Sequence, residues 1–465
     1  METQVGVRIN EGPSDWQIYQ RTAQGTADIQ LAGTWHVFDW LPPETVCTVQ
    51  ARVVSEDTGA VPNEELDWQD ATVDGNQFSV TLKGVPAGGL YRIETRIQRK
   101  YSQDVRGLRG DCVHHVGVGD IYVIAGQSNA SGTGKGAVTD PLSLGVHLFG
   151  NDESWKLATH PLEDSKNTLH PVTMTGIAHG HSPWLTFGRR VYTATGIPIG
   201  LVPTALGGSP ISRWIDEDGR QGDLLSNLRD MVDKVGGEVA GVLWYQGESD
   251  ASPDAVGLYR RRFEQFVGVV RDYVHDAQLP VFTAQLNRFL DRSADDECWS
   301  EMREIQRRAA LTMDNVFLIP TIDVPMSDAI HNSASGNVMI GERFANAALR
   351  HVYGMPTMSE FPNIETIACV DDERTQVELS FRNVSGEWMG LSAEMADFRV
   401  EDDRGEAHIE DVSAGPNGAL VLHLSRSVSR DAIVSGLFGA NPSLSARDDL
   451  GRCITPFRVS VAGIP

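Results

Sequence analysis

The sequence has few cysteines, and their arrangement excludes a disulfide framework. Five occur in 465 residues, and they are widely separated: Cys47, Cys112, Cys298, Cys369 and Cys453. Their number is odd and no C-x-x-C pair is present, so the spacing of a structural zinc site is also missing. We therefore expect the cysteines to be small core side chains in a reducing compartment.

Long apolar runs are also absent. No stretch approaches the roughly 18 consecutive apolar residues of a membrane-spanning helix, so a membrane is not expected as a partner. The N-terminal segment, METQVGVRINEGPSDW, has neither a basic n-region nor an apolar h-region. The sequence as it stands predicts a cytoplasmic protein, and a secreted or periplasmic one if a leader has been removed.

Basic side chains are outnumbered by acidic ones. The 39 Lys and Arg against 63 Asp and Glu give a formal net charge of −24. A surface of that sign repels phosphate backbones, which argues against nucleic acid and anionic lipid as partners. The sequence does not indicate an oligomeric state.

The chain divides into three segments, which matches the length prior of about three domains. Residues 1–115 and 354–465 show short alternating runs separated by turn residues, and both predict small β-sandwich domains. Residues 116–353 alternate apolar runs with helical stretches. This middle segment predicts an α/β domain with a parallel, flavodoxin-like sheet covered on both faces.

The middle segment contains five apolar runs of strand length: DIYVIAG, IPIGLVPTAL, GVLWYQG, LPVFTAQL and NVFLIPTID. Large apolar side chains between Val256 and Tyr273 recur at steps of three and four, which predicts an amphipathic helix. Two more helices are predicted, at SPWLTFGRRVYTAT, with Pro183 at the first helical position, and at GNVMIGERFANAALRHV.

Unusual polar residues follow four of these runs. Ligands of doubly wound sheets bind outside the carboxyl ends of the strands, so these residues are expected to meet at one edge. In chain order they are Ser128, Gly207 with Gly208, Gln246 with Glu248, and Asp328 with His331. The first turn is not a P-loop, because Asn129 and Gly136 occupy positions where a glycine and a hydroxyl residue are required.

The residues at this edge suit acyl transfer. An aspartate three residues before a histidine can hold its Nδ1–H and leave Nε2 free as the base for Ser128. Asp323 is a rival for that carboxylate, and Ser128 alone could be a helix cap. The backbone N–H groups of Ser128 and of the Gly207–Gly208 pair, with the Gln246 amide, could receive an oxyanion.

Four sequence blocks, GDIYVIAGQSNASG, ALGGSPISRW, WYQGESD and DAIH, resemble those of SGNH-type carbohydrate esterases, in particular the sialate O-acetylesterase-like group. The resemblance implies an SGNH hydrolase domain that removes acetyl groups from sugars through an acetyl-serine intermediate. It implies Ser128 as nucleophile, His331 as base and then acid, and Asp328 as its orienting partner. Gly207 or Gly208 and Gln246 would complete the oxyanion hole, without cofactor or metal.

Ala130 and Asp250 depart from the family pattern, which usually has Met and often Asn there, and both are expected beside the pocket. Further residues near these blocks are candidates for supporting the site or contacting substrate: Asn129, Glu248, Arg213 and Trp214. Glu248 is better explained as a loop anchor than as a second acid. Trp214 could equally be a sugar-stacking platform or part of the core.

His179 and His181 resemble a metal pair. Without matching ligands elsewhere in the sequence, we expect them to belong to a polar loop that could touch sugar.

The expected partner is an acetylated mono- or oligosaccharide. The acceptor could be sialic acid, or a xylan- or xyloglucan-derived oligosaccharide. A more remote alternative is a non-catalytic glycan-binding protein.

Overall fold

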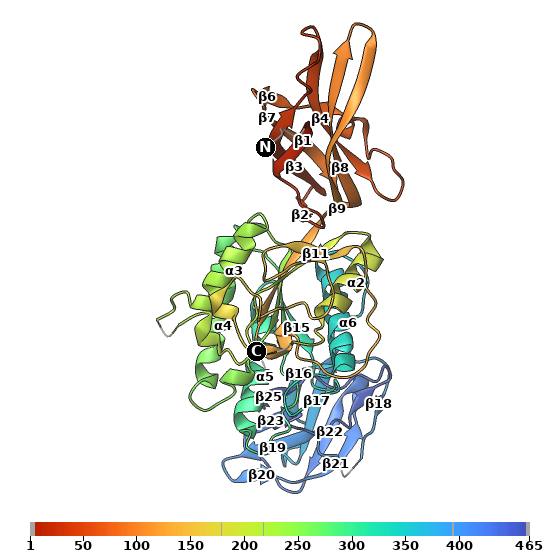
Figure 1. Cartoon of the computed structure of the whole chain (residues 1–465). Helices are drawn as coiled ribbons and strands as arrows, with labels where there is room; N and C mark the ends of the chain where they lie inside the picture. The colour runs from red at the N-terminus through yellow and green to blue at the C-terminus, as the bar shows by residue number, and fades with distance from the viewer. Residues whose placement is uncertain (1–4, 178, 217, 393–394, 462–465) are drawn as a thin grey trace.

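The computed structural model describes residues 5–177, 179–216, 218–392 and 395–461. An N-terminal β region, a central α/β region and a C-terminal β region lie in a row, with the α/β region in the middle (Figure 1). Each region has its own buried apolar cluster. Within the described residues, no helix combines the length and apolar character needed to cross a membrane.

The central region is built on a parallel sheet. Its strands run in the order β10 (Val146–Phe149), β12 (Ile199–Pro203), β9 (Asp104–Gly126), β13 (Gly241–Tyr245), β14 (Val281–Gln285) and β15 (Val316–Pro320). Strand β11 (Trp155–Leu157) adds an antiparallel edge. The five predicted apolar runs all form strands, whereas β10 and β11 were not predicted. Without β10 and β11, the order along the chain is 2-1-3-4-5, a doubly wound order.

Helices cover the sheet on both sides. Figure 1 shows α2 (Trp184–Thr195) and α6 (Ala334–His351) on one side, with α3 (Asp223–Lys234) and α4 (Val256–Tyr273) on the other. Helix α5 (Asp296–Thr312) packs against α4. The helix predicted from Val256 to Tyr273 has those bounds, and its apolar stripe is buried except for Tyr273, which is half-buried. Pro183 precedes α2 as its cap instead of occupying its first position.

Strand β9 connects the N-terminal and central regions without a break. Its first part pairs with β8 (Gly88–Tyr101), and its last residues pair with β12 and β13. The boundary predicted between residues 115 and 116 therefore falls inside a strand. Asp120 anchors this crossing, because its carboxylate accepts hydrogen bonds from Arg21, Gln20 and Tyr353.

From residue 5 onward, the N-terminal region forms two sheets around a shared cluster. One has the order β1 (Gly6–Glu11), β3 (Thr26–His36), β7 (Gln77–Pro86) and β6 (Thr72–Asp74). The other joins β4 (Val46–Ser55), β5 (Gln69–Asp70), β8 and β2 (Ile18–Gln20) to β9, so it continues into the central sheet. Ile29, Val53, Leu82 and Ile93 are among the side chains buried between them.

The described part of the C-terminal region forms three small sheets. They are β16 (Asn363–Cys369), β17 (Gln376–Arg382), β22 (Leu420–Leu424) and β21 (Ile409–Ala414); β18 (Trp388–Met389) with β24 (Arg447–Asp448); and β20 (Gly405–Ala407), β19 (Phe398–Asp402), β23 (Ile433–Gly436) and β25 (Phe457–Ser460). Arg303 of α5 is fully buried and donates hydrogen bonds to the carbonyls of Gly439 and Ala440, which ties this region to the central one.

Candidate active site

Ser128 lies on a tight turn at the carboxyl end of β9. Gly126 ends the strand with φ of +135°, and a Cβ there would lie 2.1 Å from the Tyr245 carbonyl oxygen. Glycine is therefore required for the close approach of β9 to β13. The short helix α1 (Ser128–Ser131) follows at once. Ser128 is its first residue, so its backbone N–H has no acceptor within the helix.

A hydrogen-bonded chain joins Ser128, His331 and Asp328. The Ser128 Oγ lies 3.0 Å from His331 Nε2, and His331 Nδ1 lies 2.9 Å from Asp328 Oδ2. Ser128 comes from the end of β9, whereas the other two come from the loop between β15 and α6. The side chains of His331 and Asp328 are 25% and 36% exposed, so the group is reachable from solvent.

Asp328 is held as a carboxylate. Its Oδ1 accepts the backbone N–H groups of Ile330 and His331, at 3.0 and 2.8 Å. Burial works to raise the pKa of Asp328, but the hydrogen bonds from the His331 side chain and these backbone groups outweigh it and lower the pKa to about 2. The rival carboxylate, Asp323, instead forms a two-point ion pair with Arg343 at 2.7 and 2.9 Å.

Gly207 brings backbone close to Ser128 from the end of β12. A Cβ built on Gly207 would lie 3.6 Å from the Cβ of Ser128, whereas one on Gly208 would meet nothing within 4 Å. Gly208 has φ of +71°, a left-handed conformation that favours glycine. Of the two glycines, Gly207 thus presents its backbone to the candidate nucleophile, and Gly208 permits the turn.

Gln246 does not lie as predicted. Its side chain is fully buried, and its Nε2 donates to Asp250 Oδ2 at 2.6 Å and to the Ser209 carbonyl at 3.2 Å. The same nitrogen lies 3.3 Å from Gln127 Oε1. The amide hydrogens are therefore used inside the protein and are not free for an oxyanion. Gln246 instead joins the loops after β9, β12 and β13.

Asn129 and Glu248 fix the loops of the triad to each other. Asn129 Nδ2 donates to Glu248 Oε1 at 2.8 Å and to the Ile330 carbonyl at 3.2 Å, and its Oδ1 accepts the Asn332 N–H. Burial raises the pKa of Glu248. These contacts give Glu248 the position of a loop anchor.

Trp214 does not form a sugar platform, and Arg213 forms an ion pair. Trp214 has 0% exposure and packs edge-on against Trp244 and Phe266, so it belongs to the core. The guanidinium of Arg213 is paired with Asp223. Of the two roles expected for Trp214, the structure therefore shows the core one, because packing of the loop after β12 turns the indole inward. A supporting or substrate-contacting role of Arg213 stays a prediction.

Ala130 and Asp250, expected beside the pocket, are also buried. The Ala130 carbonyl accepts the Trp184 indole N–H at 2.6 Å. Asp250 Oδ2 accepts the Ile211 backbone N–H and the Gln246 amide. Ala130 and Asp250, the two residues that differ from the family pattern, therefore contribute to internal packing.

A cavity of about 370 Å³ lies beside the Gly207 turn, and its lining includes residues that the sequence did not mark as part of a site. Ile177 lines it and lies 4.0 Å from the Cβ position of Gly207. His179, also in the lining, hydrogen-bonds Ser165, in agreement with its predicted place in a polar loop. Residues 148–166 form much of the remaining wall, but nothing in their local pattern marks them as part of a site.

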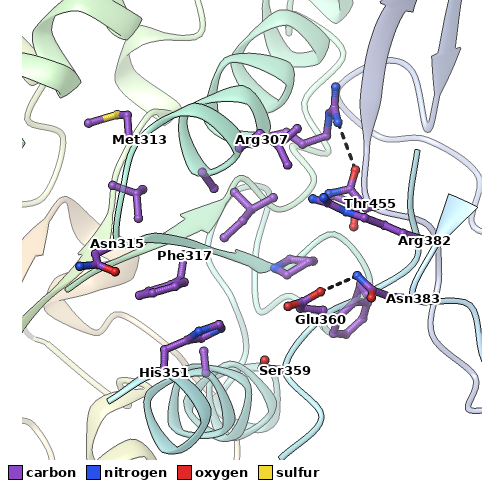
Figure 2. Close-up of a pocket in the computed structure, with 18 of the residues that line it drawn as sticks. Arg307, Met313, Asn315, Phe317, His351, Ser359, Glu360, Arg382, Asn383 and Thr455 are labelled. Carbon is purple, nitrogen blue, oxygen red and sulfur yellow. Dashed lines mark hydrogen bonds between the residues drawn. The ribbon is translucent and has the colours of Figure 1, made fainter. Parts of the chain in front are cut away.

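A second cavity, of about 350 Å³, lies away from the triad between β15, α6 and the C-terminal region (Figure 2). Ser359 and His351 line it, but no hydrogen bond joins Ser359 Oγ to another described residue. Asn383 donates to Glu360 across its wall. This cavity contains none of the predicted site residues and no serine–histidine hydrogen bond.

Known proteins resemble this chain in sequence and in fold. Residues 118–350 match the family described as carbohydrate esterase, sialic acid-specific acetylesterase. A probable carbohydrate esterase of Arabidopsis thaliana is 28% identical over 251 residues, which are 49% of this chain and 90% of the plant protein. A sialate O-acetylesterase of Homo sapiens is 25% identical over 243 residues, covering 41% of this chain and 44% of the human protein.

Among solved structures, a carbohydrate acetylesterase from Xanthomonas citri matches with a TM-score of 0.64. The alignment covers 96% of this chain and 98% of that one at 20% identity, so it supports the fold across all three regions. The family match covers half of the chain and includes all four sequence blocks. The chain therefore belongs to the carbohydrate esterase family of sialic acid-specific acetylesterases and is an esterase of the hydrolase class.

Proposed function

We propose that this protein removes acetyl groups from O-acetylated sugars by acyl transfer to Ser128 and then to water. The observation that carries the proposal is the chain of two hydrogen bonds, Ser128 Oγ to His331 Nε2 and His331 Nδ1 to Asp328. Such a chain gives the hydroxyl a base and gives the base a fixed tautomer. The sugar substrate is supported by the family to which the chain belongs.

In the first half of the reaction, His331 Nε2 accepts the Ser128 hydroxyl proton while Oγ bonds to the acetyl carbonyl carbon. The developing oxyanion would accept hydrogen bonds from the backbone N–H groups of Ser128 and Gly207. The intermediate then collapses, the sugar oxygen takes the proton from His331, and acetyl-Ser128 remains. Asp328 stays ionised and stabilises the imidazolium.

In the second half, water takes the place of the sugar. His331 removes a proton from the water as its oxygen bonds to the acetyl carbon, and the second tetrahedral intermediate uses the same donors. Its collapse transfers the proton from His331 to Ser128 Oγ and releases acetic acid, which ionises to acetate in solution. All groups that move protons in this scheme belong to the protein.

The test compares wild type, Ser128→Ala and Ser131→Ala on p-nitrophenyl acetate, acetylated xylo-oligosaccharides and O-acetylated sialic acid. Ser131 lies on the same helix and is a matched control outside the triad. We expect Ser128→Ala to lose about 10⁶-fold in kcat, which is complete loss in practice, and Ser131→Ala to remain active. Equal cleavage by wild type and Ser128→Ala would refute the nucleophile, and the better sugar substrate identifies the acceptor.

A further inference from the structure

We propose that Asp140, His160 and His181 form a binding site for one divalent transition-metal ion, with Zn²⁺ as the probe. The three residues come from separate loops, before β10, after β11 and before α2. One oxygen or nitrogen of each lies within 4.8 Å of the others. The site lies outside the triad and its chemistry does not depend on the proposed esterase reaction.

Two of the three distances between the ligand atoms match a zinc coordination shell. Asp140 Oδ2 lies 3.1 Å from His160 Nε2 and 3.2 Å from His181 Nε2. Ligand atoms about 2.0–2.1 Å from a tetrahedral zinc ion are about 3.3 Å apart. The Asp140 side chain is 2% exposed and that of His181 is 9% exposed, so water shields them poorly from each other.

His181 provides an independent sign of a missing partner. Both of its ring nitrogens are buried and neither has a hydrogen-bond partner among the described residues, although Nε2 lies 3.2 Å from Asp140. Buried polar groups are hydrogen-bonded in the great majority of cases. A metal ion bound by both Nε2 and the Asp140 carboxylate would explain why these two groups approach to 3.2 Å without a hydrogen bond.

Arg189 and Ser182 surround the ligands. Arg189 Nη2 lies 3.1 Å from Asp140 Oδ1, so it orients the carboxylate through the oxygen that faces away from the two imidazoles. The Ser182 N–H lies 3.4 Å from His160 Nδ1. When His160 coordinates through Nε2, its remaining proton moves to Nδ1, and this long contact is given up.

The donor set selects the class of metal. Two imidazole nitrogens and one carboxylate oxygen suit zinc and its transition-metal neighbours, whereas Ca²⁺ and Mg²⁺ prefer oxygen ligands. A second group, Glu153, His170 and Asp230, fails the same test. There Glu153 lies near Nε2 of His170 and Asp230 lies near Nδ1. The two nitrogens of one imidazole cannot both face the same ion.

A metal here would fasten the loops behind the Ser128 turn. Gly132 accepts the Gly180 N–H, and Gly134 exchanges backbone hydrogen bonds with His181. These residues directly follow helix α1, which carries Ser128. The ion would therefore act on the stability of the turn and not on the acyl transfer itself.

The experiment uses the full chain without a histidine tag, stripped with a chelator and then dialysed. Zn²⁺ is titrated in competition with a chromophoric chelator, and Co²⁺ binding is followed by its visible absorption. Wild type is compared with Asp140→Asn and His160→Ala, with folding checked by circular dichroism. His179→Ala is the matched control, because His179 lies in the same segment but bonds Ser165.

We expect one equivalent of zinc in wild type, His179→Ala and Ser128→Ala. Loss of a neighbouring hydrogen-bond partner already costs about 10–100-fold in metal affinity, so loss of a ligand in His160→Ala should cost at least about 100-fold. Absence of zinc binding in wild type, or unchanged binding in a folded His160→Ala, would overturn the proposal. Zinc binding by Ser128→Ala separates this test from that of the proposed function.

Discussion

Replacing Asp328 by asparagine should stop His331 from acting as a base while the structure of the site is kept. The Asn Oδ1 can still accept the N–H groups of Ile330 and His331, which now bond Asp328 Oδ1. Its NH₂ then faces His331 Nδ1, which must accept, so the ring proton moves to Nε2 and points at Ser128 Oγ. The expected loss in kcat is about 10⁴-fold, or about 5.4 kcal/mol of transition-state stabilisation.

The assay for this variant is steady-state hydrolysis of p-nitrophenyl acetate, with Asp323→Asn as the matched control. Asp323 pairs with Arg343 and makes no contact with His331 among the described residues. Its variant should keep its kcat while its Tm falls, because a buried ion pair loses a partner. A folded Asp328→Asn enzyme with more than about a tenth of wild-type kcat would refute the argument, and so would a kcat loss in Asp323→Asn alone.

Three further predictions follow from buried side chains. Glu248→Gln should remain active because an amide oxygen can accept from Asn129, whereas Glu248→Ala should lose about tenfold or more in kcat; equal kcat values would contradict the anchoring role. Trp214→Ala should lower the free energy of unfolding by about 4 kcal/mol in denaturant titrations, with KM unchanged; a raised KM without lost stability would restore the sugar platform. Burial raises the pKa of Glu163 from 4.5 to about 8, so the folded protein keeps a proton at pH 7 that the unfolded chain releases. The contribution of the neutral Glu163 carboxyl to stability is fully present below pH 4.5 and is lost as the pH rises toward 8. The free energy of unfolding of Glu163→Gln should therefore exceed that of wild type by up to about 3 kcal/mol at pH 7 and equal it at pH 4. A gain equal at both pH values would contradict this.

The strands and helices that sequence reasoning found are those whose packing is local and apolar. The stripe between Val256 and Tyr273 packs against the core because its members are large and apolar, and the predicted strands are mainly apolar, as in β12 (IGLVP) and β13 (GVLWY). Helix α5 was missed because its buried face includes charged residues, among them Arg303 and Arg307. The carbonyls that accept from Arg303 belong to Leu286, Asn287, Gly439 and Ala440, outside the helix, so no local pattern predicts its burial.

In the candidate site, too, contacts between distant parts of the chain could not be predicted from local sequence. Ser128, Asp328 and His331 could be predicted to meet, because strand order places the carboxyl ends of β9 and β15 at one edge. The orientations of the Gln246 and Trp214 side chains could not be predicted, because they depend on Asp250 and on an aromatic cluster from other elements. The contact between His181 and Asp140 likewise joins two separate loops.

The most direct test of the account is the identity of the acylated residue. The enzyme would be mixed with an activated acetyl ester, quenched in acid within the first turnover, digested and examined by mass spectrometry. The account predicts one acetyl group on the peptide containing Ser128, absent from Ser128→Ala and present in Ser131→Ala. An acetyl group on a different residue, or turnover without any acetylated peptide, would contradict it.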